Sequence, residues 1–300
     1  MNPETRPLAR ATVPALAALL LTAGCTRIIT RAAGNALAAD GALFAAEDDP
    51  ELVRQALPFG LKTLEGLLAK APQDDRLLLA AASGFTQYAY AFVQQDAEFL
   101  AEKDPPAARA GLARARRLYQ RARDYGLRGL ESRHRGFAAA LAADPRATAA
   151  GAIREDVPLL YWTAAAWGAW VAQSKDDMRA VGQLAQVEAL LERALALDEA
   201  WEGGALHELA VSYFAARGDA PRAKAHFGRA LALGGGKKLG PMVAYAEGAC
   251  VSAQDRRTFE QLLEQVLGFD ADSAPAHRLA NLLAQSRARW LKARTEDLFL

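Results

Sequence analysis

The stretch Val187-Glu188-Ala189-Leu190-Leu191-Glu192-Arg193-Ala194 decides the fold class of this 300-residue chain. Its aliphatic Val187, larger Leu191 and small Ala194 stand at spacings of four and three, which places them on one face of an α-helix. The same triplet returns at intervals of 36 residues, as Ala223/Phe227/Ala230 and Phe259/Leu263/Val266. Less regular copies precede it, as Gly60/Leu64/Leu67 and Ala115/Tyr119/Ala122. A fixed period of this size is typical of helical repeats, in which each helix pair buries its apolar face on its neighbours.

The composition agrees with an all-helical chain. Hydrophobic residues make up 52% of the sequence, mostly as alanine and leucine, and no window alternates with period two for long. These features exclude sandwiches, barrels and doubly wound α/β folds. Prolines and glycines divide the chain into about thirteen segments of helical length, with predicted helix starts at Asp104, Asp219 and Ser273. We therefore predict an all-α, tetratricopeptide-like helical-repeat solenoid over residues 41–300.

The first residues are typical of an exported lipoprotein. Arg6 and Arg10 lie near an apolar run, Ala11 to Ala23, that is too short to span a bilayer. Leu21-Thr22-Ala23-Gly24-Cys25 resembles the bacterial lipobox, whose cysteine carries the lipid of the mature protein, with palmitate among its acyl chains. A plain secretory signal that contains a cysteine is the alternative. We expect a signal peptide over residues 1–24 and a lipid anchor and tether over residues 25–40.

The residue after the cysteine bears on location. An acylated Cys25 would hold the protein on a membrane surface without spanning it. Thr26 is not the aspartate that favours retention in the inner membrane. The sequence therefore predicts the periplasmic face of the outer membrane.

The charge balance excludes one class of partner. Lysine and arginine total 36 against 35 acidic residues, far from the excess that phosphate backbones select, so we expect no nucleic acid. Basic residues gather locally between positions 114 and 135, as Arg114, Arg116, Arg117, Arg121, Arg123, Arg128, Arg133 and Arg135. Such a run on a helix favours a solvated face over a binding patch.

Catalytic and metal-binding patterns find little support. His134, His207, His226 and His277 are dispersed without metal-ligand spacing. The glycine-rich stretch from Gly234 to Pro241 has neither a Ser or Thr after Lys237 nor a preceding strand, so it predicts a loop between repeats and not a phosphate loop. Cys250 is the only cysteine besides Cys25 and is expected to be a buried, inert thiol. We predict no enzyme activity, no cofactor and no metal.

Six segments together resemble one family. They are Val157–Gly168, Leu191–Asp198, Gly204–His207, Lys224–Leu231, Gln254–Phe259 and Arg278–Gln285. In order and content they are similar to the T-component lipoproteins associated with TRAP transporters, over nearly the whole chain. The resemblance implies a homo-oligomer, a trimer with a central pore, that pairs with a periplasmic TRAP-type substrate-binding protein. It also implies the handling of a small-molecule solute that is hydrophobic or acidic.

Aromatic residues on one segment are the first candidates for a ligand site. Tyr161, Trp162, Trp167 and Trp170 lie within ten residues on one expected helix, with small alanines between them. They would wall an apolar cavity, or they would pack the helix against the next repeat. The pattern leaves both interpretations open.

Two amides on the last long segment are the second candidates. Asn281 and Gln285 stand four residues apart beside an apolar face, where buried amides need hydrogen-bond partners. They would either bond a neighbouring helix end or line a cleft, with Arg287 and Arg289 adding a carboxylate clamp.

The leading hypothesis is therefore a lipid-anchored auxiliary component of a TRAP-type solute uptake system, which docks a substrate-binding protein and handles a small, hydrophobic solute. The alternative is a tetratricopeptide-like scaffold lipoprotein for envelope protein assembly, which contacts proteins through its concave face and handles no solute.

Overall fold

The computed structural model describes residues 44–299, which are 82% helical and contain no strand. The predicted all-α class is confirmed. The expected signal peptide over residues 1–24 and the anchor and tether over residues 25–40, with Cys25, lie outside the described residues.

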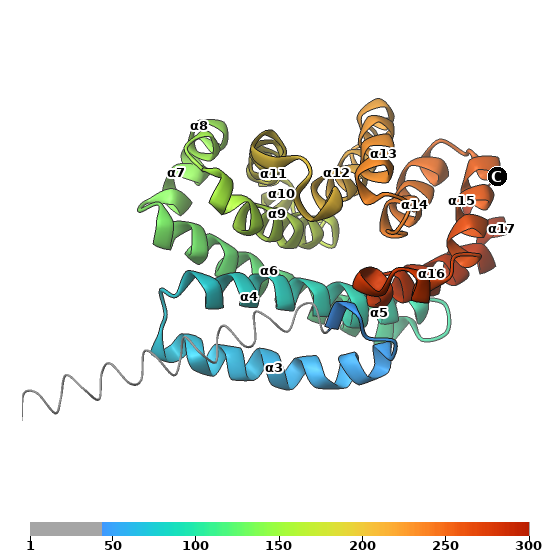
Figure 1. The fold of residues 1–300 in the computed structure, drawn as a ribbon, viewed down its shortest axis with the longest axis horizontal. Coiled ribbons are helices and arrows are strands. Elements are labelled where there is room, and N and C mark those ends of the chain that lie inside the picture. Colours follow the sequence, from blue (N-terminus) through green and yellow to red (C-terminus); the bar gives the residue numbers. More distant parts are fainter. Residues whose placement is uncertain (1–43, 300) are drawn as a thin grey trace, which may run out of the picture.

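The first helices form a hairpin of α3 (Pro50–Lys70) and α4 (Asp75–Tyr88), on which the long helix α6 (Pro105–Arg133) packs. Between α4 and α6 lie the π-helical η1 (Ala89–Gln94) and α5 (Gln95–Phe99). α4, η1 and α5 run on as one helix, whose middle part is π-helical. α6 packs between α4 and α9, as Figure 1 shows.

The middle of the chain continues the stack of helices. Its elements are α7 (Phe137–Ala143), α8 (Pro145–Ala150), η2 (Arg154–Asp156), α9 (Val157–Ala172), α10 (Met178–Val181), α11 (Leu184–Asp198), η3 (Trp201–Gly203), α12 (Ala205–Ala216) and α13 (Ala220–Gly234). α9 packs on α11, and α12 packs on α13. Each helix thus buries its apolar side mainly on elements close to it in the chain.

The last part of the chain turns back toward the first helices. Its elements are α14 (Gly240–Tyr245), the π-helical η4 (Ala246–Cys250), α15 (Arg256–Leu267), η5 (Ala271–Ser273), η6 (Pro275–His277), α16 (Arg278–Ala293) and α17 (Thr295–Leu298). α16 reaches α3 and the turn before it, where Arg278 Nη1 donates to the Ala46 carbonyl at 3.1 Å. Figure 1 shows α16 beside α5, so the described chain curves until its end meets its beginning.

Three of the five repeated triplets lie wholly in the core. Ala115, Tyr119 and Ala122 on α6 are fully buried, and the triplets of α11 and α15 are buried to the same degree. Burying a side chain the size of Tyr119 or Phe259 contributes about 1.5–3 kcal/mol. The buried residues separate into a large cluster over α3–α13 and a smaller one around Phe259 and Leu291 in the last helices. The repeat-solenoid arrangement itself stays a prediction.

Two of the three predicted helix starts are confirmed. Asp104 accepts from the Ala107 N–H at 3.0 Å, and Asp219 accepts from the Arg222 N–H at 3.1 Å. The start at Ser273 is wrong. Its hydroxyl donates to the Asp270 carbonyl at 2.6 Å within a 3-10 turn, and α16 begins only at Arg278.

Candidate functional site

The aromatic side chains of α9 have two different environments. Trp167 and Trp170 are 7% and 8% exposed, and the Arg123 guanidinium lies 5.4 and 4.9 Å from their ring centroids. The Trp167 indole N–H donates to Gln183 Oε1 at 3.1 Å. These two tryptophans therefore make the contacts that the helix-packing interpretation requires.

Tyr161 and Trp162 are only partly buried and belong to a second aromatic group. The Tyr161 ring lies 4.8 Å from Trp162, edge to face, and 4.7 Å from Trp201 of η3. These two side chains are less deeply buried than Trp167 and Trp170. A contact of either with a solute stays a prediction.

Charged and phenolic groups from several elements face one another beside this aromatic group. Tyr90 of η1 is 48% exposed, yet its pKa is raised to about 12, first by burial and then by Glu247, with Arg287 opposing. Glu208 acts on Tyr90 and also on Tyr161, whose pKa is raised mainly by burial. Tyr90, Glu98, Tyr161, Glu208, Glu247 and Arg287 are thus linked electrostatically, and we call this group of residues the polar hollow. Of its members, Glu98, Glu247 and Arg287 line a pocket.

The carboxylate of Glu208 packs against Gly240, which leaves room for it because glycine has no side chain. A Cβ added at Gly240 would lie 1.8 Å from Glu208 Oε1. Lys238 Nζ lies 3.6 Å from Glu208 Oε2 and donates to the Glu202 carbonyl at 3.0 Å. Burial raises the pKa of Glu208, and Lys238 opposes this shift. Glu202 has a left-handed φ of 48°, a strained conformation of the kind that clusters at functional sites.

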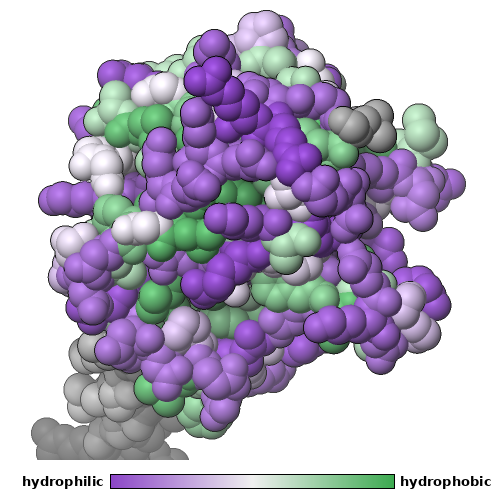
Figure 2. All heavy atoms as spheres, turned by 90° about the vertical axis from the view of Figure 1, so that its right-hand side faces the viewer, coloured by the Kyte–Doolittle hydropathy of each residue, from purple (hydrophilic) through white to green (hydrophobic). Residues whose placement is uncertain are grey.

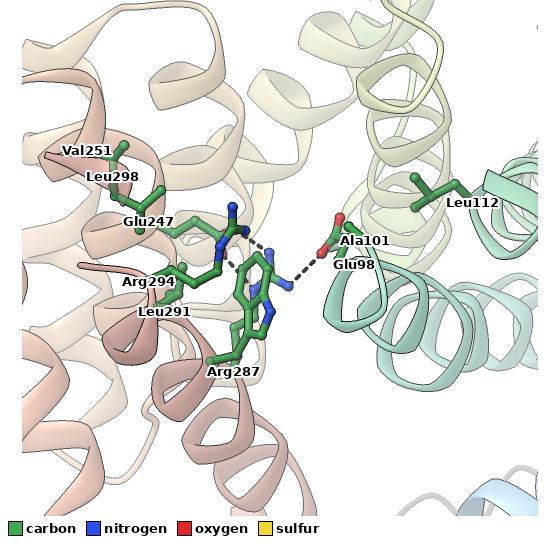
Figure 3. Close-up of a pocket in the computed structure, with 10 residues that line it drawn as sticks. Glu98, Ala101, Leu112, Glu247, Val251, Arg287, Leu291, Arg294 and Leu298 are labelled. Carbon is green, nitrogen blue, oxygen red and sulfur yellow. Dashed lines mark hydrogen bonds and ion pairs between the residues drawn. The ribbon is translucent and has the colours of Figure 1, made fainter. Parts of the chain in front are cut away.

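Arg287 is the most enclosed charge of the hollow, at 6% exposed. Its Nε donates to Glu247 Oε2 at 3.1 Å, and its Nη1 lies 2.6 Å from Glu98 Oε2, too misaligned for a hydrogen bond (Figure 3). Its guanidinium also lies 4.3 Å from the Trp290 ring centroid. Burial alone would lower the pKa of Arg287, but Glu247 and Glu98 raise it above its ordinary value. The guanidinium therefore stays charged.

A pocket of about 380 Å³ opens beside Arg287, between the last helices and the α5–α6 region. Its charged and aromatic lining consists of Glu98, Glu247, Arg287, Trp290 and Arg294, and its apolar lining of Ala101, Leu112, Val251, Leu291 and Leu298. The protein face that includes these last helices is largely polar, with apolar side chains in narrow strips (Figure 2). The pocket lining thus combines two guanidinium groups and two carboxylates with apolar side chains.

Both π-helical segments contribute to this region. Tyr90 lies in η1 and Glu247 in η4. Glu98, just after η1, accepts from Gln94 Nε2 at 2.9 Å, and Gln94 Oε1 in turn accepts from the buried Tyr119 hydroxyl at 2.6 Å. π-helical turns are rare in proteins, and those that occur are often found at functional sites. The presence of two such segments here therefore supports a site at Arg287.

A profile of the TRAP transporter T-component family matches residues 46–299. The chain belongs to the TRAP transporter T-component family. It is also 31% identical over 267 residues to an uncharacterized protein of Treponema pallidum (strain Nichols), a match that covers 86% of this chain and 83% of the relative. The family resemblance inferred from the six segments is thereby confirmed, and with it a role as an auxiliary component of a TRAP transporter. The T-component family is a transport family and not an enzyme family.

The two candidate amides of this T-component are engaged by backbone groups. Asn281 Oδ1 accepts from the Leu239 N–H at 3.1 Å, and its Nδ2 donates to the Lys237 carbonyl at 2.9 Å. Gln285 Nε2 donates to the carbonyls of Val266 and Phe269. Asn281 therefore fixes the loop that presents Lys238, and Gln285 holds the end of α15. A direct ligand contact of either amide stays a prediction.

Sequence reasoning missed most of the polar hollow. Tyr90, Glu98, Glu208 and Glu247 were not singled out, although Glu208 and Glu247 each interrupt an alanine-rich apolar stretch. A lone carboxylate in such a stretch is the signal that points to an inward-facing charge. The gathering of these residues depends on the return of α16 to α5, which no local pattern indicates.

Three general features of the T-component complete the picture. Within residues 44–299, no helix is long and apolar enough to cross a membrane. The same range holds no cluster of three or more His, Cys, Asp or Glu side chains arranged to bind a metal ion. Cys250 is buried, and burial raises the pKa of its thiol to about 12, which agrees with the predicted inert thiol.

Proposed function

We propose that this T-component is a lipid-anchored periplasmic auxiliary of a TRAP-type uptake system, which docks a substrate-binding protein and handles a small solute. Its lipobox-like Cys25 carries the acyl chains that hold it on the outer membrane. The protein works as a homo-oligomer, a trimer. Membership of the T-component family supports the transport role, and the pocket beside Arg287 supports the handling of a solute.

The lining of the pocket indicates the chemistry of the solute. Leu112, Leu291 and Leu298 offer apolar surface, and Arg294 adds a guanidinium group to the lining. Arg294 Nε is 2.9 Å from the exposed Glu102, and its guanidinium lies 4.6 Å from the Trp290 ring centroid. Nη1 and Nη2 of Arg294 have no hydrogen-bond partner among the described residues. A small amphipathic carboxylate matches this arrangement, because its acid group binds the guanidinium fork and its chain covers the leucines.

The docking part of the proposal is tested by affinity purification of the detergent-solubilised full-length lipoprotein from its native envelope, with mass-spectrometric identification of the proteins recovered. A TRAP-type substrate-binding protein is expected. Recovery of envelope-assembly proteins in its place would favour the scaffold alternative and overturn this function.

The solute part is tested by measuring octanoate binding to the full-length protein by calorimetry. Arg294→Gln is expected to weaken binding about tenfold, since it removes a charge-assisted contact. Arg289→Gln is the matched control, because Arg289 is exposed on α16, which ends just before Arg294, and makes no ion pair among the described residues. Equal affinities of octanoate and octylamine, or equal effects of the two variants, would exclude the carboxylate assignment.

A further inference from the structure

The long helix α6 carries eight arginines and no lysine. Six of them are exposed, and four of the six, Arg114, Arg117, Arg121 and Arg128, share one face of the helix. At 3.6 residues per turn they fall within an arc of about 60°, and at 1.5 Å per residue they span about 21 Å. We call these four residues the arginine stripe.

Most of the charge of the arginine stripe is not neutralised. Arg114 Nη2 bonds the Tyr88 hydroxyl at 3.1 Å, and Arg128 Nη2 donates to the Pro72 carbonyl at 2.8 Å, both neutral groups. Arg117 makes no hydrogen bond or ion pair among the described residues. Only Arg121 approaches a carboxylate, at 3.4 Å from Glu65. In a chain with 36 basic and 35 acidic residues, three unpaired charges on one helix face form a local positive surface.

Aromatic rings hold three of these side chains in place. The guanidinium groups of Arg114 and Arg121 lie 5.6 and 5.4 Å from the ring centroids of Tyr88 and Phe85 on α4. That of Arg128 lies 5.4 Å from the Tyr125 ring. A guanidinium stacked on a ring loses less conformational freedom when it binds a partner. The spacing of seven residues separates successive stacked groups by about 10.5 Å, or two helical turns.

The residue types indicate which partner suits the stripe. A planar guanidinium binds carboxylates in a two-pronged fork that lysine does not offer. The exposed large apolar residues of the described chain, such as Phe59 and Met178, lie outside α6, so the stripe has no side chain to insert into a lipid layer. These features favour the acidic surface of a folded protein over a membrane.

We infer that the arginine stripe is the surface on which the T-component docks an acidic face of its substrate-binding protein. The inference rests on the proposed function, because it names the contact surface for the proposed partner. Long-range attraction to carboxylates would speed association, and the fork contacts would set the orientation of the complex.

The test compares three forms of the full-length lipoprotein in the same envelope purification, over a series of KCl concentrations. The stripe variant is Arg114→Gln/Arg117→Gln/Arg128→Gln, which keeps Arg121 and its contact with Glu65. The control is Arg146→Gln/Arg179→Gln/Arg257→Gln, which removes three charges from exposed arginines of α8, α10 and α15 that make no ion pair within residues 44–299. Thermal unfolding followed by circular dichroism establishes that all three forms fold alike.

The expected result is that the wild type and the control recover the substrate-binding protein, whereas the stripe variant recovers about tenfold less and has a weaker salt dependence. Equal recovery by all three forms would overturn the docking surface and leave the proposed function intact. Failure of the wild type itself to recover a substrate-binding protein would overturn both.

A vesicle arm separates the protein partner from a lipid surface. The same three forms are floated with vesicles made of equal parts phosphatidylcholine and phosphatidylglycerol. The stripe variant is expected to bind them like the control. A loss of vesicle binding confined to the stripe variant, with unchanged recovery of the substrate-binding protein, would assign the stripe to anionic lipid and overturn the inference.

Discussion

Arg287 Nη1 lies 2.6 Å from Glu98 Oε2, and this ion pair joins the last long helix of the chain to the end of the first layer. Glu247 binds the same guanidinium from within the C-terminal helices. Arg287 therefore connects the two hydrophobic clusters through charge, at the border of the pocket. Arg287 is one of several contacts that join the two ends of the described chain, beside the ring contact of Phe99 with Trp290.

Arg287→Ala is expected to lower the free energy of unfolding by about 3–5 kcal/mol, because it leaves Glu98 and Glu247 partly buried without their partner. Urea unfolding measured by circular dichroism gives this difference. The exposed Arg289→Ala is the control, with an expected change within about 0.5 kcal/mol. A loss below about 1 kcal/mol in Arg287→Ala would mean that the closure is held by apolar contacts.

Gly126→Ala is expected to destabilise the protein by about 1–3 kcal/mol. A Cβ at position 126 would lie 2.2 Å from Thr163 Oγ1 and 3.2 Å from Thr163 Cα, so α6 and α9 would have to separate. Gly66→Ala in α3 is the matched control, since its Cβ would meet no atom within 4 Å, and it should stabilise by about 0.5–1 kcal/mol. Thermal unfolding of both variants checks the opposite signs.

Stability is expected to fall as the pH drops below 6.5, partly because of a histidine pair. His207 Nδ1 lies 2.8 Å from His226 Nδ1, and burial is the main cause that lowers both pKa values from 6.5. Glu199 beside His207 opposes the shift there, and Arg222 adds to it at His226. The unfolded chain binds protons at a pH where the folded pair stays neutral, so protonation favours unfolding.

His226→Gln should reduce this pH dependence, and urea unfolding at pH 7.5 and pH 5 measures it. The half-buried His277 is not suited as a control, because its pKa is also lowered by burial. His134→Gln serves better, as His134 contacts the carboxylate of Asp156 and not a second imidazole. An unchanged slope in His226→Gln would show that other groups control the acid sensitivity.

Local patterns could predict the fold class and several element ends. The triplets around Tyr119, Leu191 and Phe259 mark buried helix faces, and Asp104 and Asp219 mark helix starts, since each of these signals acts within a few residues. The predicted helix start at Ser273 is wrong because Asp270 caps a 3-10 turn that already includes Ser273. The physical basis of each success and of this error is short-range hydrogen bonding and periodicity.

The candidate site was only partly predictable for a different reason. The sequence shows the aromatic residues of α9 as a cluster, but it does not show that Arg123 and Gln183 contact Trp167 whereas Tyr161 packs on Trp201. The polar hollow joins residues up to 197 positions apart, from Tyr90 to Arg287. Such contacts follow from helix packing angles and from the π-helical turns, which periodicity does not encode.

Asn281→Ala separates a structural role of this amide from a ligand contact. Its side chain bonds the Leu239 N–H and the Lys237 carbonyl, so its loss leaves backbone groups unsatisfied and is expected to cost about 1–3 kcal/mol. The loop would then hold Lys238 less firmly beside Glu208. The Asn281 side chain positions the charge of Lys238 and touches no solute. Octanoate affinity should therefore change less than about twofold once the protein is fully folded, whereas stability falls. Gln285→Ala, which frees two carbonyls at the end of α15, is the comparison. A large loss of affinity in Asn281→Ala with unchanged urea unfolding would assign Asn281 to the solute site instead.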